Sequence, residues 1–161
     1  MRKHVLLVVL VLLVLSASGC IADESDSSKT YMVPMRDGVK LSTGVALPDG
    51  AGPWPVILLR TPYNKDPILT GADRFTRKGF AVVAQDLRGR FASEGTDTVF
   101  MTDGWGELQD GYDAIEWIAS QPWCDGKVGM TGGSALGITQ YLAAGAAPAA
   151  LKCCDATVAA A

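Results

Sequence analysis

The sequence has 161 residues, of which 48% are hydrophobic, and its formal net charge at pH 7 is −3. This length suggests one domain at most. Because no basic block occurs beyond Arg2-Lys3-His4, the chain lacks the electrostatic footprint of a nucleic-acid-binding protein, and we expect no nucleic acid among its partners.

The N-terminus has the pattern of an export signal. Arg2 and Lys3 form a short positive region, and an apolar run follows over residues 5–15. This run is shorter than the roughly 20 residues that a membrane-spanning helix needs, but it has the length of a signal-peptide core. The small residues of LSASGC then lead to Cys20, which resembles the lipidated cysteine of a bacterial lipoprotein, although Ala17 stands where a leucine is usual.

We therefore expect residues 1–20 to be a lipoprotein-type signal peptide and the acidic, serine-rich residues 21–29 to be a flexible tether. The protein would then be exported and attached through its lipid to a membrane, on the extracytoplasmic side. Two alternatives stay open, namely an ordinary secretory peptide cut near Ala17 or Gly19 and a plain transmembrane anchor.

The segment after residue 30 alternates between short apolar runs and helical patterns. Two strands joined at Asp37-Gly38 come first, because this dipeptide between apolar runs is a strong hairpin signal. The other predicted elements are a strand over 56–60, a helix over 71–78, a strand over 80–86, a helix within 105–121, a strand over 127–131, a helix over 134–144 and a strand over 151–159. The apolar face of the second helix is predicted from residues with helical spacing: Leu108, Tyr112, Ile115 and Ala119.

This alternation predicts an α/β fold, with a mostly parallel sheet, helices on both faces and antiparallel edge strands from the leading hairpin. Such sheets carry their functional groups at the C-terminal ends of the strands. The loops after Arg60, Asp86 and Thr131 are therefore the predicted location of a site.

Three cysteines follow Cys20, and we expect them to be small buried residues: Cys124, Cys153 and Cys154. No CxxC spacing or histidine partner accompanies them, so no metal site is predicted.

Ser134 lies in GGSALG, between a predicted strand and a predicted helix. A tight turn there would expose its hydroxyl as a nucleophile, and the amide of Ala135 would face the reacting carbonyl. The common pattern G-x-S-x-G is not matched, because Leu136 stands at the second position after the serine and the glycine comes one residue later. On the motif alone, a simple strand-to-helix turn and a phosphate-binding loop lacking GK[ST] remain alternatives.

Four stretches together resemble one family of α/β-hydrolases, the cocaine esterase, X-Pro dipeptidyl-peptidase and acylase group. These stretches are VPMRDGVKLSTGVALP, LLRTPYNK, KGFAVVAQDLRGRFASEG and DGYDAIEWIASQPWCDGKVGMTGGSALGITQ, and they cover nearly all of residues 31–151. The elbow of this family has the spacing G-x-S-x-x-G, which the sequence matches. A tyrosine commonly follows the family's serine, whereas this sequence has Ala135.

The resemblance implies a serine hydrolase that cleaves an ester, an amide or a peptide through an acyl-enzyme on Ser134, without metal or organic cofactor. It implies that the hydroxyl of Tyr63 and the amide of Ala135 bind the oxyanion. It also implies that Asp86, Arg88, Ser93 and Glu94 belong to a structural loop at the floor of the site.

The general base is the missing element of this interpretation. The family's triad aspartate and histidine follow the serine, but the only histidine of the chain is His4 and the only acid after Ser134 is Asp155. We therefore expect residues 30–161 to be the N-terminal part of a catalytic domain, truncated before the family's cap, triad partners and C-terminal jelly-roll domain. The alternative is a non-catalytic surface lipoprotein with a hydrolase-like half domain.

Lipidation can be tested directly at Cys20. Radiolabelled fatty acid should enter the expressed protein and should be absent from Cys20→Ser, because the lipid is attached through the cysteine sulfur. An unlabelled parent protein, or a labelled variant, would count against the lipoprotein assignment.

Overall fold

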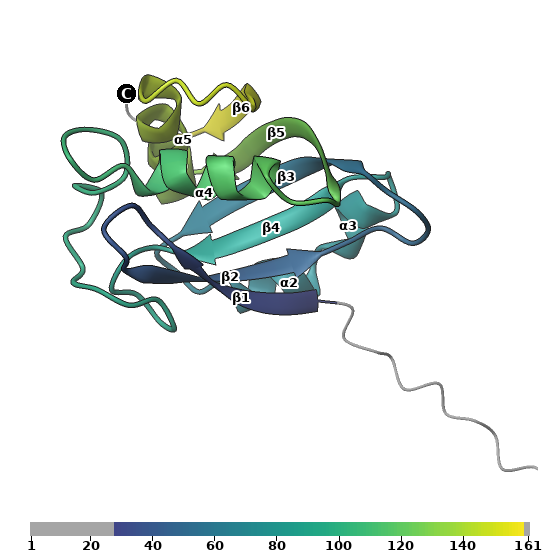
Figure 1. Cartoon of the computed structure of the whole chain (residues 1–161), viewed down its shortest axis with the longest axis horizontal. Coiled ribbons are helices and arrows are strands. Elements are labelled where there is room, and N and C mark those ends of the chain that lie inside the picture. Colours follow the sequence, from purple (N-terminus) through teal and green to yellow (C-terminus); the bar gives the residue numbers. More distant parts are fainter. Residues whose placement is uncertain (1–27, 160–161) are drawn as a thin grey trace, which may run out of the picture.

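The structure is a computed structural model that describes residues 28–159 (Figure 1). The expected signal peptide, Cys20 and residues 21–27 of the expected tether lie outside the described residues. The last two tether residues, Ser28 and Lys29, are already part of the first strand. None of the helices within the described range combines the length and apolar character needed to cross a membrane.

Six strands form one mixed sheet in the order β1-β2-β4-β3-β5-β6. β1 and β2 form an antiparallel hairpin, β2 pairs antiparallel with β4, and the remaining neighbours are parallel. The strands are β1 (Ser28–Pro34), β2 (Lys40–Ala46), β3 (Trp54–Thr61), β4 (Ala81–Asp86), β5 (Cys124–Gly133) and β6 (Leu151–Thr157). The predicted fold class, with its leading hairpin, is thus confirmed.

Helices lie on both faces of the sheet, with α4 and α5 on one side and α2 and α3 on the other (Figure 1). They are α2 (Asp66–Thr70), α3 (Asp73–Thr76), α4 (Asp110–Ala119) and α5 (Ala135–Gly145). Successive side chains of a strand point to opposite faces, so Val83 packs in the cluster that contains Ile115 of α4, while Val82 packs beside Phe75 of α3. This two-sided burial explains why β4 is buried along its whole length and why its first four residues, 81–84, are apolar.

The predicted helix over 71–78 is wrong in its bounds, since the structure has two short helices, one that ends before residue 71 and one that begins at Asp73. Asp66 and Pro67 start α2, and Gly71 follows its last residue before the chain resumes in α3. Prolines often mark loops, but Pro67 lies in the first turn of α2, where proline is favoured because its missing N–H has no partner to lose.

The predicted apolar face of the next helix is also partly wrong. Leu108 precedes α4, which begins at Asp110, and the buried apolar face follows Ala114, Ile115 and Ile118. Gly111 faces α5 so closely that a Cβ there would lie 2.9 Å from the Cβ of Ala143. Small residues therefore set this helix contact, and a count of large apolar residues does not detect them.

The expectation of three buried cysteines is wrong for two of them and only partly met for the third. Cys153 and Cys154 are exposed and Cys124 is half-buried, all as free thiols. Cys153 and Cys154 belong to β6, which pairs only with β5 and forms an edge of the described sheet.

Candidate active site

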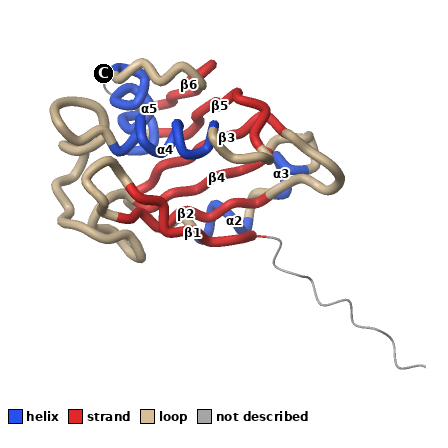
Figure 2. Tube along the Cα trace, viewed as in Figure 1, coloured by secondary structure: helices blue, strands red, loops and turns tan. Residues whose placement is uncertain are grey.

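The loops that follow β3, β4 and β5 leave the sheet at the same edge, because these three strands are parallel neighbours. Their last residues are Thr61, Asp86 and Gly133. Figure 2 shows the long loop between β4 and α4 in tan at this end of the sheet. The prediction that these three loops meet at one edge is confirmed.

Ser134 occupies a sharp turn between β5 and α5. Its backbone has φ 54° and ψ −121°, a conformation that costs a residue with a side chain about 1–3 kcal/mol. The residue is exposed, and within residues 28–159 its hydroxyl has no hydrogen-bond partner. The turn therefore presents an unpaired hydroxyl to solvent.

The two glycines before Ser134 make room for this turn. Gly132 has φ +135°, and a Cβ there would lie 2.6 Å from the side chain of Leu136. A Cβ on Gly133 would lie 3.1 Å from the carbonyl oxygen of Thr157 in β6, and that same oxygen accepts the N–H of Ser134 at 2.9 Å. The strained turn thus packs against Leu136 on one side and is hydrogen-bonded to β6 on the other.

The first turn of α5 places backbone donors beside the serine. The carbonyl of Ser134 accepts the N–H groups of Gly137 at 2.9 Å and Ile138 at 3.1 Å, so the helix begins directly at the turn. The N–H of Ala135 has no partner among the described residues, as expected for the first amide of a helix. The positive end of the helix dipole adds to the attraction of this position for an anion.

Tyr63 lies in the loop after β3, and its side chain is 63% exposed. Two anchors shape this loop: the N–H of Tyr63 donates to Oγ1 of Thr61 at 3.0 Å, and the N–H of Lys65 donates to Oδ1 of Asp86 at 2.8 Å. Burial raises the pKa of Asp86, although the Lys65 amide and ammonium favour its charged form. Asp86 therefore supports the loop that carries Tyr63, in line with the structural role expected for it.

Tyr63 and Ala135 line the same cavity, which has a volume of about 220 Å³. The other residues around it come from the loop after β3 and the loop between β4 and α4: Pro62, Leu87, Arg90, Asp97, Val99 and Phe100. The hydroxyl of Tyr63 has no hydrogen-bond partner within residues 28–159. The structure thus brings together the two positions that the sequence assigned to oxyanion binding, immediately beside Ser134.

Charged side chains fix the long loop between β4 and α4. Arg88 donates to Asp37 in the hairpin turn at 2.7 Å and to Asp110 at the start of α4 at 2.6 Å. The hydrogen bond to Asp110, and then that to Asp37, raise the pKa of the Arg88 guanidinium, so it stays charged. Glu94 accepts the N–H of Lys40 in β2 at 3.0 Å. The expected structural loop is therefore present, and it ties three separate elements together.

Val99 and Phe100 are residues of the cavity that sequence reasoning missed. No predicted element and no predicted site residue falls on the segment 98–104 that contains them. The available signal was a group of apolar residues, VFM followed by a tryptophan, inside an otherwise polar loop.

A family model described as X-Pro dipeptidyl-peptidase (S15 family) matches residues 37–161. The chain belongs to this family. The resemblance found in the four sequence stretches is thereby confirmed.

One related protein and two solved structures are similar to this chain. The chain is 44% identical to cocaine esterase from Rhodococcus sp. (strain MB1 Bresler) over 131 residues, which cover 78% of this chain and 22% of the esterase. An α-amino acid ester hydrolase structure aligns with a TM-score of 0.72 at 32% identity, over 87% of this chain and 27% of that one. A CocE/NonD family hydrolase from Staphylococcus aureus aligns with a TM-score of 0.68 at 29% identity, over 80% of this chain and 26% of that one.

The chain thus spans about a quarter or less of the length of cocaine esterase and about a quarter of each of the two hydrolase structures. The residues that the family model matches, 37–161, include the strand-turn-helix unit around Ser134 and the loop that carries Tyr63.

The close approach at Gly132 predicts a measurable cost for a side chain there. Gly132→Ala should lower the free energy of unfolding by about 3 kcal/mol, because the variant combines an unfavourable φ with an overlap against Leu136. Gly126→Ala is the matched control, since Gly126 also has a positive φ, of +82°, but has nothing within 4 Å of the added Cβ. It should cost only about 1 kcal/mol.

Urea denaturation followed by tryptophan fluorescence measures both variants. Equal costs at the two glycines would show that the packing around the turn is looser than described.

Proposed function

We propose that this chain carries the nucleophile and the oxyanion site of a serine hydrolase that cleaves an ester or an amide. The observation that supports it most is the backbone of Ser134, at φ 54° and ψ −121°, which exposes the hydroxyl directly before α5. A simple strand-to-helix turn does not need this strained conformation, and a phosphate-binding loop does not need an exposed serine hydroxyl at its tip.

In the proposed reaction, Oγ of Ser134 attacks the carbonyl carbon of the substrate while a base takes the hydroxyl proton. The negative charge that develops on the carbonyl oxygen accepts hydrogen bonds from the N–H of Ala135 and the hydroxyl of Tyr63. The phenolic O–H of a tyrosine is a hydrogen-bond donor. Collapse of the tetrahedral intermediate releases the alcohol or amine, and water then hydrolyses the acyl-enzyme.

The base and the carboxylate that orients it are proposed to come from polypeptide outside residues 28–159. The only histidine of the chain is His4. Asp155, the one acid after Ser134, lies in β6, where its Oδ2 accepts the hydroxyl of Thr131 at 3.0 Å. The relatives are about four times longer or more than the matched segment, which leaves room for both groups elsewhere. Attachment to a membrane through Cys20 remains part of the proposal.

The 161-residue chain by itself should therefore show negligible hydrolysis of p-nitrophenyl acetate. A serine hydroxyl without a base is a poor nucleophile, so the rate should equal that of the Ser134→Ala variant. Hydrolysis by the purified chain that disappears in Ser134→Ala would contradict the need for an outside base.

A chimera tests the assigned roles. Residues 30–159 of this chain replace the matched segment of the Rhodococcus cocaine esterase, and the proposal requires the remaining sequence of that esterase to supply the base and its orienting carboxylate. The chimera should hydrolyse p-nitrophenyl acetate, Ser134→Ala should lower kcat/KM by about 10⁴-fold or more, and Tyr63→Phe should lower kcat by about 10²- to 10³-fold.

Tyr31→Phe is the control for Tyr63→Phe. Tyr31 lies in β1, where its ring packs against Trp117 of α4, and it does not line the cavity beside Ser134. The control substitution should leave kcat unchanged. A folded chimera that stays inactive would favour the non-catalytic lipoprotein. A chimera that keeps its activity in Ser134→Ala would contradict the role of Ser134 as the nucleophile.

A further inference from the structure

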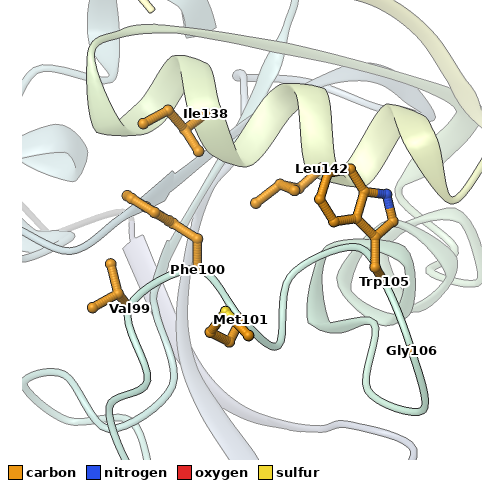
Figure 3. Close-up of a pocket in the computed structure, with 7 residues that line it drawn as sticks. All are labelled: Val99, Phe100, Met101, Trp105, Gly106, Ile138 and Leu142. Atoms are coloured by element: carbon orange, nitrogen blue, oxygen red, sulfur yellow. The ribbon is translucent and has the colours of Figure 1, made fainter. Parts of the chain in front are cut away.

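A second cavity lies between α5 and the loop that precedes α4 (Figure 3). Its volume is about 510 Å³, which is within the range of small-molecule sites. The residues that line it are Val99, Phe100, Met101, Trp105, Gly106, Ile138 and Leu142. None of these side chains carries a charge, so the cavity is apolar on every side.

This apolar cavity continues from the cavity beside Ser134. Val99 and Phe100 line both of them. Ile138 and Leu142 follow Ser134 by four and eight residues, so they lie on the same face of α5, about 6 and 12 Å farther along its axis. A substrate whose carbonyl sits at Ser134 can therefore extend a chain along this face into the cavity.

The wall opposite α5 is fixed to the sheet. Asp103, at the centre of the segment 99–106, is buried and forms an ion pair of 2.5 Å with Arg60 of β3. Nε of Arg60 also donates to Gln85 of β4 at 2.8 Å. Gly104 lies against the backbone of Leu142 so closely that any Cβ would overlap the Leu142 carbonyl. The cavity is thus preformed, which lowers the entropy cost of binding.

Large apolar side chains on this wall are in contact with water. Met101 is 79% exposed and Trp105 is 71% exposed, while Figure 3 shows Phe100 and Trp105 directed toward the side chains of α5. An apolar ligand group would remove this surface from water, which favours its binding.

We propose that this cavity binds the apolar acyl chain of an ester substrate, with the chain running from the carbonyl at Ser134 past Ile138 to Leu142. The proposal rests on the proposed function, because it takes the carbonyl to sit at the elbow. It names medium-length acyl esters as the substrate class.

Binding of a fatty acid tests the cavity without requiring turnover. The full 161-residue chain is titrated with sodium hexanoate and, for comparison, sodium acetate, and tryptophan emission is recorded. Hexanoate should bind at least about 10-fold more tightly than acetate, because its four additional methylenes enter the cavity. Trp105→Phe should lose the change in emission but retain the affinity when binding is measured by calorimetry.

Two variants locate the site. Leu142→Gln changes polarity at nearly constant size, and Met101→Gln does so at an exposed position where the fold does not depend on the side chain. Each should weaken hexanoate binding by about 5-fold or more and leave acetate binding unchanged. Leu47→Gln is the control, since Leu47 lines a different hollow beside Pro48 and Asp49, and it should have no effect. Equal affinities for the two acids, or unchanged hexanoate binding in both cavity variants, would overturn the proposal and indicate that this apolar wall is covered by polypeptide.

The chimera separates the two proposals. If it is active, Leu142→Gln should lower the ratio of kcat/KM for p-nitrophenyl hexanoate to that for the acetate by about 5-fold, and an unchanged ratio would contradict the acyl site. If it is inactive toward both esters, the proposed function fails, and the hexanoate titration still decides whether the cavity binds an acyl chain.

Discussion

The backbone conformation of Ser134 is the constraint on which the rest of the site depends. A conformation that costs about 1–3 kcal/mol persists only where its neighbours compensate. Here Gly132 and Gly133 give the space, and the carbonyl of Thr157 in β6 accepts the Ser134 N–H. The direction of the turn also decides the direction of α5, and with it the positions of Ile138 and Leu142 along the candidate substrate path. A single strained residue thus orients the hydroxyl, the first helix amide and the wall of a cavity.

Buried charges hold the loops that surround this turn. Arg60 and Asp103 connect the sheet to the segment 99–106, and Arg88 connects the hairpin turn to the start of α4 through Asp110. The net stability from such pairs is small, because the cost of removing each charge from water offsets much of the attraction. Their contribution here is positional, since a guanidinium and a carboxylate accept few alternative geometries. The apolar core fixes the sheet, and the ion pairs fix the loops upon it.

Particular residues show where sequence reasoning succeeded and where it failed. The strand at 81–86 was predictable because a strand buried on both faces contains a continuous apolar run, here residues 81–84. Helix α2 was missed because Pro67 has opposite meanings in a loop and in a first helical turn. The buried face of α4 was misplaced because Gly111 approaches α5 closely only by having no side chain. A pattern of large apolar residues does not include such a glycine. Cys153 and Cys154 were misjudged because the sequence of β6 does not reveal that this strand lies at an edge of the described sheet.

The sequence by itself determined the chain order of the six strands, the strand-to-helix turn at Ser134 and the family to which the chain belongs. These properties depend on local patterns, namely apolar runs, glycines next to one serine and spacing within motifs. Only the tertiary structure decided that Tyr63 and Ala135 line one cavity, and that the segment 99–106 faces Ile138 and Leu142. Those contacts join residues about 30 to 70 positions apart. They follow from the strand order β4-β3-β5 and from ion pairs across the sheet, which no local pattern encodes.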